Sequence, residues 1–174
     1  LILLVVDLQT DPLQQLEDSI AILEKQRIVS CHLRDRHKGR RRVTFKPLLV
    51  LANKYEDEDW SEDFDIFCEL LEADWPLLPV SATSGRNLEH LKRVLFDRLE
   101  IVRVYSRAPG QEPDYSSPFT LHKGATVEEF ARQVHQDFYT QLKAARVWGS
   151  GAFDGQMVGR DHVLQDGDEV ELRI

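Results

Sequence analysis

Three short runs of apolar residues, each followed by the pattern of an amphipathic helix, constrain the fold of the first hundred residues. The runs cover residues 1–6, 47–51 and 77–80, and they are rich in leucine and valine without alternating polar residues. Such runs are typical of strands that are buried on both faces of a parallel sheet. Three strand–helix units in succession predict an α/β fold with right-handed crossovers. The three helical faces consist of Leu13, Leu16, Ile20 and Leu23; Phe64, Phe67, Leu70 and Leu71; and Leu88, Leu91, Leu95 and Leu99.

Polar residues mark where several helices should begin. Asp11 precedes the first helical face and is followed three residues later by Gln14, which predicts a capping box. Asn87 is expected to cap the third helix. In the second half of the chain, Thr126 and Glu129 have the same capping-box spacing.

The residue pattern changes near Ile101. Residues 101–107 alternate as in a strand, and residues 108–113 form a turn-rich connection. Further strands are expected at 119–122, 145–148 and 169–174, around one helix that buries Val127, Phe130, Val134 and Phe138. This order predicts an α+β domain of the β-grasp type. We therefore expect two domains, residues 1–100 and residues 101–174.

The last predicted strand alternates between apolar and charged residues. Its inward face should carry Val170, Leu172 and Ile174, and its outward face should carry Glu169, Glu171 and Arg173. This pattern predicts a strand with one face on the core and one face in water.

Two polar segments directly follow the second and third apolar runs. The first is Asn53-Lys54-Tyr55-Glu56, and the second is Ser81-Ala82-Thr83-Ser84-Gly85. The carboxyl ends of parallel strands meet at one edge of a sheet, and open α/β sheets bind ligands there. The sequence therefore predicts a ligand site built from both segments.

At these segments the chain resembles the translation-factor-like GTPases, whose guanine-recognition loops read Asn-Lys-x-Asp and Ser-Ala-x. The resemblance implies that Asn53 holds the two loops together and that Lys54 lays its aliphatic stem along the base. It also implies that Glu56 accepts hydrogen bonds from guanine, and that the Ala82 N–H meets the guanine oxygen. The implied binding set for GTP or GDP is Asn53, Lys54, Glu56, Ser81, Ala82 and Thr83.

Guanine selectivity has a physical basis in such a site. Guanine offers two adjacent donors that a carboxylate accepts as a fork, whereas adenine presents an acceptor at N1. A site that loses a buried hydrogen bond to the wrong ligand discriminates by roughly 10⁴ or more. The family has Asp where this chain has Glu56. Because the Glu side chain is one methylene longer, its fork should reach the base with altered geometry.

The second half of the chain resembles a TGS domain, named after threonyl-tRNA synthetase, GTPases and SpoT. The resemblance rests on residues 101–105, 119–124, 147–149 and 158–170, together with the helix after Thr126. With GTPase-like loops before it, this arrangement is similar to the Obg-related GTPases of the developmentally regulated GTP-binding protein type. It implies a GTP hydrolase that acts with the ribosome or structured RNA in translation. The TGS domain would report the nucleotide state to a regulatory partner.

Two phosphate-side motifs of GTPases are absent from the 174 residues. Neither Gly-x-x-x-x-Gly-Lys-Ser/Thr nor Asp-x-x-Gly after a strand occurs. In the family these motifs precede the strand that corresponds to residues 1–6. The resemblance therefore implies the C-terminal part of a GTPase domain, which alone should neither bind Mg²⁺ in the family's manner nor hydrolyse GTP. Its first strand should also have an apolar edge open to self-pairing.

Charge is unevenly distributed along the chain. The net charge of −8 argues against a chain-wide surface for polyanions. Basic residues nevertheless crowd residues 34–46, and acidic residues crowd residues 56–65. The basic stretch fits either phosphate contacts, which would make binding salt-dependent, or a solvated loop, and both interpretations stay open.

No apolar run is long enough to cross a bilayer, and the first residues do not form a signal peptide. We therefore expect a cytoplasmic protein without a membrane partner. Cys31 and Cys68 are expected to be reduced, because they form no Cys-x-x-Cys unit. The scattered histidines predict no metal site.

A function from another class also fits the sequence. In it, the chain is a non-catalytic module that binds RNA or protein through its TGS domain, and the nucleotide loops are vestigial. Glu56 favours this alternative because it departs from the guanine-binding pattern. A scaffold that binds only proteins is a third hypothesis.

Overall fold

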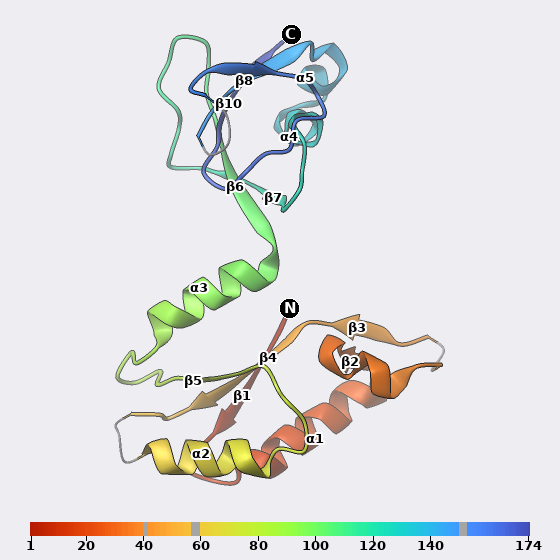
Figure 1. Cartoon of the computed structure of the whole chain (residues 1–174), viewed down its shortest axis with the longest axis vertical. Helices are drawn as coiled ribbons and strands as arrows, with labels where there is room; N and C mark the ends of the chain where they lie inside the picture. Colours follow the sequence, from red (N-terminus) through yellow and green to blue (C-terminus); the bar gives the residue numbers. More distant parts are fainter. Residues whose placement is uncertain (40–41, 57–59, 150–152) are drawn as a thin grey trace. The chain divides into compact units, whose positions relative to one another are not determined.

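The computed structural model describes residues 1–39, 42–56, 60–149 and 153–174. It divides into two compact units, which we call unit 1 (Leu1–Leu99) and unit 2 (Glu100–Ile174). Figure 1 shows the elements of each unit. Two of the basic residues, Arg40 and Arg41, and three acidic ones, Asp57, Glu58 and Asp59, lie outside the described residues.

Unit 1 is built on a parallel sheet of three strands, as the sequence predicts. The strands are β1 (Ile2–Asp7), β4 (Leu48–Asn53) and β5 (Leu77–Pro79), in the order β1-β4-β5. The helices are α1 (Pro12–Lys25), α2 (Trp60–Leu70) and α3 (Leu88–Leu99). Side chains of α1 and α2 pack on one face of the sheet, and α3 packs on the other. The predicted α/β fold of this half is confirmed.

The two long strands of this sheet differ in burial. The first five residues of β4 are buried, as expected for a central strand covered on both faces. On β1, Leu4 and Val6 are buried, but Leu3 is 42% exposed and Val5 is 58% exposed. The prediction of two buried faces is therefore wrong for β1. The physical reason is that α3 packs against β4 and β5 and leaves this face of β1 uncovered.

Two predicted core positions on the helices are also exposed. Leu70 is exposed as the last residue of α2, whereas Leu71, directly after the helix, packs on the core. Leu99 is exposed in the last turn of α3, beyond Leu95, the last leucine of this helix that packs on the sheet.

The predicted helix starts are confirmed to different degrees. Asp11 caps α1 by accepting a hydrogen bond from the Gln14 N–H (3.0 Å), but the Gln14 side chain donates to Asp18 instead of completing the box. The box formed by Thr126 and Glu129 is complete. Asn87 directly precedes α3, but its side-chain amide donates to the Pro79 carbonyl over 2.9 Å, which ties the helix to the end of β5, and its role as a helix cap stays a prediction.

A small β–η–β unit, which the sequence did not predict, contains the basic stretch. It consists of β2 (Ile28–Ser30), the 3₁₀ helix η1 (Cys31–His37) and β3 (Thr44–Lys46). The strands β2 and β3 pair in parallel, with Val29 opposite Phe45. Three-residue strands give too short a pattern for recognition from sequence, because their pairing depends on contacts distant in the chain.

Unit 2 has the β-grasp arrangement that the sequence predicts. Its strands are β6 (Ile101–Ser106), β7 (Phe119–His122), β8 (Ala144–Trp148), β9 (Gln156–Val158) and β10 (Glu169–Arg173), in the order β7-β6-β10-β8-β9. The central pair β6 and β10 is parallel, and the other pairs are antiparallel. The short strand β9 was not predicted.

The helical segment of unit 2 is divided in two. The sequence predicts one helix, but the structure has α4 (Val127–Val134) and α5 (Gln136–Gln141), separated by His135 in an extended conformation (φ −168°). Phe130 is fully buried, and Val134 and Phe138 pack around the same core.

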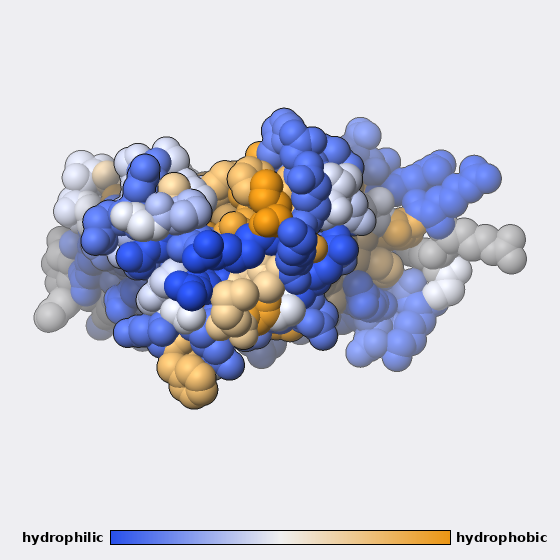
Figure 2. Space-filling view, turned by 90° about the horizontal axis from the view of Figure 1, so that it is seen from above, coloured by the Kyte–Doolittle hydropathy of each residue, from blue (hydrophilic) through white to orange (hydrophobic). Residues whose placement is uncertain are grey.

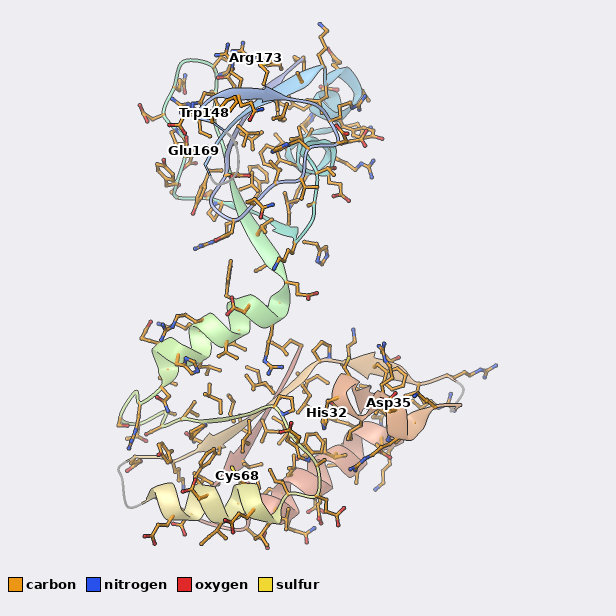
Figure 3. All side chains as sticks on the ribbon, viewed as in Figure 1. His32, Asp35, Cys68, Trp148, Glu169 and Arg173 are labelled. Carbon is orange, nitrogen blue, oxygen red and sulfur yellow. The ribbon has the colours of Figure 1, made fainter. Side chains whose placement is uncertain are left out.

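Glu171 contradicts the predicted outward face of the last strand. Only 3% of this residue is exposed, although Val170 on the opposite face is buried as predicted. The Arg173 guanidinium lies 2.5 Å from the Glu171 carboxylate. Arg146 on β8 is the cross-strand neighbour of Glu171. Because β10 is flanked by strands on both sides, neighbouring long side chains can cover its outer face as well. Figure 3 marks Arg173 on this strand.

None of the helices in the described residues is both long enough and apolar enough to cross a membrane. Hydrophilic side chains cover most of the face shown in Figure 2, and apolar side chains form small groups between them.

Candidate functional site

Three loops meet at the carboxyl edge of the sheet in unit 1. Asp7 and Asn53 are paired in the register of β1 and β4. The Leu8 N–H donates to the Asn53 carbonyl over 3.1 Å, and the Tyr55 N–H donates to the Val80 carbonyl over 3.0 Å. The backbone therefore joins the loops after β1, β4 and β5, as the sequence predicts for the two segments it singled out.

Asn53 joins the second loop to the third through its side chain. Its Oδ1 accepts a hydrogen bond from the Ala82 N–H over 3.1 Å. The donor that the resemblance assigns to the guanine oxygen is thus bonded to Asn53. Ser81 is fully buried, and its Oγ accepts from the Ser84 N–H over 3.1 Å, which shapes the third loop.

Lys54 makes an ion pair that the sequence did not predict. Its Nζ lies 2.7 Å from Asp7 Oδ2 in the first loop, and its backbone is left-handed (φ 71°). The hydrogen bond from Lys54 holds the pKa of the Asp7 carboxyl below its usual value, against the opposing effect of burial. Asp7 was missed because no motif links the end of the first strand to the segment after the second.

The first loop is itself fixed by one glutamine. Gln15 Oε1 accepts from the Asp7 N–H over 3.1 Å, and Gln15 Nε2 donates to Thr10 Oγ1 over 2.6 Å. The Asp7 carboxylate also accepts from the Gln9 N–H over 2.9 Å. Asp7 is therefore held in place independently of Lys54.

Tyr55 and Arg86 form a second bridge between the loops. The Arg86 guanidinium lies over the Tyr55 ring, with its carbon 4.4 Å from the ring centroid. The other contact of this ring is edge-on to Phe64 of α2 at 5.7 Å. The Arg86 carbonyl accepts from the Ser81 N–H over 3.1 Å, so Arg86 belongs structurally to the third loop. Sequence reasoning singled out neither the aromatic ring nor its cation.

The members of the implied binding set differ in their exposure to solvent. Glu56, Ala82 and Thr83 are exposed, and Asn53 and Lys54 are half-buried. Ser81 is the buried member. The edge thus presents a carboxylate and an ammonium close to loops that are held by hydrogen bonds.

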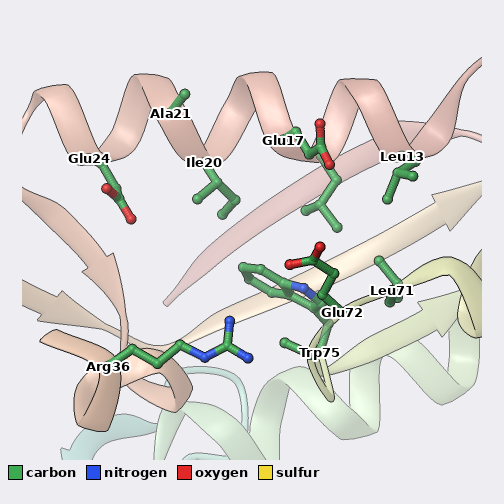
Figure 4. Close-up of a pocket in the computed structure, with 11 residues that line it drawn as sticks. Leu13, Glu17, Ile20, Ala21, Glu24, Arg36, Leu71, Glu72 and Trp75 are labelled. Carbon is green, nitrogen blue, oxygen red and sulfur yellow. The ribbon is translucent and has the colours of Figure 1, made fainter.

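A separate groove of about 320 Å³ lies elsewhere in unit 1 (Figure 4). Its walls come from α1, η1 and the segment after α2, and none of the implied nucleotide-binding residues lines it. Apolar side chains such as Ile20 and Trp75 line it together with Glu17, Glu24 and Glu72. Arg36 of η1 also points into this groove.

Comparison with known proteins places this geometry in a family. Residues 102–174 match the family model of the TGS domain. Developmentally-regulated GTP-binding protein 1 of Xenopus laevis is 34% identical over 128 residues, which are 72% of this chain and 34% of that protein. The chain thus carries a TGS domain and is homologous to GTP-binding proteins of the developmentally regulated, Obg-related type. The family expected from the sequence is confirmed.

Other relatives in this family have similar coverage. A GTP-binding protein of Methanocaldococcus jannaschii is 36% identical over 131 residues, which are 74% of this chain and 33% of that protein. Ribosome-interacting GTPase 1 of Saccharomyces cerevisiae is 32% identical over 130 residues, which are 74% of this chain and 34% of that protein. The chain spans about one third of the length of these relatives.

Solved structures of GTPases share the fold. The Schizosaccharomyces pombe YchF GTPase matches with a TM-score of 0.57 at 15% identity, covering 94% of this chain and 56% of that one. A GTP-binding protein from Pyrococcus horikoshii matches with a TM-score of 0.53 at 22% identity, covering 76% of this chain and 47% of that one. The fold is therefore part of a P-loop GTPase sheet followed by a TGS domain.

Proposed function

We propose that this family member recognises guanine nucleotides through the loops at the carboxyl edge of unit 1. The observation that carries the proposal is the hydrogen bond from the Tyr55 N–H to the Val80 carbonyl, which joins the loops after β4 and β5 through their backbone. A site whose loops are already joined loses less conformational entropy when the base binds. Relatives named as GTP-binding proteins support this proposal.

Each residue of the set has a defined role in this proposal. Glu56 accepts from the two adjacent donors of guanine, because its exposed carboxylate is open to a ligand. The stem of Lys54 lies along the base, and Asn53 keeps the loops together. When the base binds, the Ala82 N–H turns from Asn53 Oδ1 to the guanine oxygen. Ser81 and Thr83 shape and border the third loop.

GTP hydrolysis is proposed only for the full-length protein. The residues described here do not fit the Mg²⁺ ion that GTPases hold on their phosphates, because the 174 residues contain no P-loop motif. Among the described residues, no group of three or more His, Cys, Asp and Glu side chains could hold a metal ion. We therefore assign these residues to base recognition and not to phosphate chemistry.

We also propose that the protein acts at the ribosome, and hence in the cytoplasm. This part rests on the yeast relative named as a ribosome-interacting GTPase and on the TGS domain. In this role unit 2 passes the nucleotide state of the GTPase domain to a ribosomal or protein partner.

A second candidate is a binding module whose nucleotide loops are vestigial. Two observations favour it: Glu56 stands where the family has Asp, and the Lys54 ammonium is already paired with Asp7. In that case unit 2 binds RNA or protein and nucleotide has no effect.

Thermal unfolding of the full-length protein with GDP, GTP or ATP separates the two functions. A ligand present at one hundred times its Kd stabilises the folded state by about 2.7 kcal/mol. We expect stabilisation by GDP and GTP but not by ATP. Glu56→Gln should abolish this guanine preference and Glu56→Asp should keep it, whereas Glu62→Gln on α2 serves as the matched control. An unfolding temperature that nucleotides do not change, or that ATP raises as much as GDP and GTP do, would favour the module with vestigial nucleotide loops.

A further inference from the structure

The basic stretch of unit 1 has a charge opposite to that of the chain. Between Arg34 and Lys46 the sequence has seven basic residues and one acidic residue, although the net charge of the chain is −8. Of the basic residues that the structure describes, we define the basic face as Arg34, Lys38, Arg42 and Lys46, all of which are exposed. Its charge density is therefore local and is not a consequence of overall composition.

The helix that carries part of the basic face is anchored. Leu33 is buried, and the His37 Nε2 lies 3.5 Å from Glu24 of α1. The His32 ring packs edge-on against Trp75 with centroids 4.2 Å apart, and His32 Nδ1 lies 2.7 Å from Ser30 Oγ. These contacts hold η1 against the rest of unit 1, so that Arg34 projects from an anchored helix and Lys38 directly follows it.

The strand β3 carries Lys46, and Arg42 lies in the turn that precedes it. The strand pairs in register with β2, and the Thr44 N–H donates to the Arg27 carbonyl over 2.8 Å. Arg42, Thr44 and Lys46 are exposed at alternate positions, while the residues between them are half-buried. The backbone of Arg42 is left-handed (φ 62°), so this residue turns the chain into β3. Figure 1 shows β2 and β3 together at the end of unit 1.

Arg34 is oriented by an aromatic ring. Its guanidinium carbon lies 5.0 Å from the centroid of the Phe45 ring on β3. A guanidinium stacked on a ring keeps its N–H donors in one plane, which suits a forked bond to phosphate. Lys38 pairs with Asp35, but both side chains are more than three-quarters exposed, so that the pair is weak and exchangeable.

Arg36 is excluded from the basic face because it has a different environment. It lines the groove that also contains Glu17, Glu24 and Glu72 (Figure 4). Its charge is therefore partly compensated by carboxylates of unit 1.

We propose that the basic face binds the phosphate backbone of RNA. An ordered set of exposed cations with a stacked arginine is suited to phosphate, which supplies most of the electrostatic affinity of nucleic-acid binding. A membrane or protein surface would add apolar anchors. No large hydrophobic side chain is exposed in the described residues between Arg27 and Pro47. Only the identity of the RNA rests on the proposed role at the ribosome, and binding itself does not depend on nucleotide.

Anisotropy of a labelled RNA tests this inference with the full-length protein. A single-stranded RNA and an RNA hairpin are titrated at several KCl concentrations, for wild type and for the variant Arg34→Ala/Arg42→Ala/Lys46→Ala. Each lost phosphate contact should reduce the salt slope by about 0.7 to 0.9. We expect the triple variant to bind at least about tenfold more weakly at low salt, with a slope lower by about two.

A matched variant controls for net charge. Lys92→Ala/Arg93→Ala/Arg98→Ala removes three exposed cations from α3 of the same unit and should change binding and slope much less. Arg34→Lys/Arg42→Lys keeps the charge and should retain most of the affinity. Equal losses in the two triple variants, or wild-type binding that is insensitive to salt, would overturn the inference. Binding of anionic lipid vesicles without binding of RNA would also overturn it.

The same samples separate this inference from the proposed function. RNA binding that is retained in a protein unaffected by guanine nucleotides contradicts only the nucleotide site. If GDP stabilises the protein but RNA binding does not require the basic face, only the proposal that the basic face binds RNA is contradicted.

Discussion

The Lys54 ammonium lies 2.7 Å from the Asp7 carboxylate and so joins the loop after β1 to the loop after β4. Both side chains are partly exposed, and exposed ion pairs contribute about 0.2–1 kcal/mol. The pair neutralises the ammonium of a residue whose stem is proposed to lie along the base. Asp7 therefore influences the candidate site although it belongs to no recognition motif.

Replacing Asp7 by Asn should lower the free energy of unfolding by up to about 1 kcal/mol at neutral pH. The pKa of Asp7 is lowered in the folded state, so this contribution is present above the usual value near 3.8 and is lost as the pH falls through the lower folded pKa. Urea unfolding at a series of pH values measures the difference. The gap between wild type and variant should narrow below about pH 4. Asp97→Asn on α3 is the control, and a gap that persists in acid would contradict the assignment.

Arg86 and Tyr55 should be energetically coupled. A cation over an aromatic ring contributes about 0.5–1 kcal/mol at an exposed site. Arg86→Ala and Tyr55→Ala should each destabilise unit 1, and the double variant should destabilise it by less than the sum of the two. Urea unfolding of the four proteins gives the coupling energy. Tyr55→Phe keeps the ring and should behave like wild type, whereas strictly additive single variants would show that the contact contributes nothing.

In unit 2, Glu169 should control the ionisation of Tyr115. The Tyr115 hydroxyl donates to Glu169, which also accepts from Arg107 over 3.1 Å and lies beside Trp148 (Figure 3). The hydrogen bond to Glu169 raises the pKa of Tyr115 above its usual value of 10.0. Because the folded state holds the protonated phenol, this stabilisation is present below about pH 10 and is lost as the pH rises through the higher folded pKa.

Alkaline titration of the phenolate absorbance tests this relationship. The titration step that is lost in Tyr115→Phe identifies the phenolate signal of Tyr115. In Glu169→Ala this step should occur at lower pH. Wild-type and Glu169→Ala curves that coincide would contradict the prediction.

The exposed face of β1 should promote self-association of the 174-residue chain. Leu3 and Val5 are exposed on a strand at the edge of the described sheet, and exposed apolar edge strands favour pairing between molecules. Leu3→Lys/Val5→Lys should reduce concentration-dependent light scattering and change the free energy of unfolding by about 0.5 kcal/mol or less. Val6→Lys, at a buried position, should unfold unit 1 and serves as the contrast. Scattering equal to that of wild type would show that this face is not adhesive.

The sequence by itself determined the order of the longer strands and helices and the two polar segments at the carboxyl edge. These features depend on the spacing of residues close together in the chain, as in the apolar runs before Asn53 and Ser81 and the capping box of Thr126. The family resemblance rested on the same local motifs. For this reason the α/β sheet, the β-grasp unit and the meeting of the two loops could be predicted from the sequence.

Only the tertiary structure decided which side chains face each other and which faces are covered. The pairing of Lys54 with Asp7, the stacking of Arg86 on Tyr55 and the order of the basic face depend on residues that are far apart in the chain. The exposure of Val5 and the burial of Glu171 depend in the same way on neighbouring elements. An alternating or continuous apolar pattern shows that a face can be buried. Whether it is buried depends on which helix or side chain packs over it, because burial is a property of the packed neighbours and not of the strand alone.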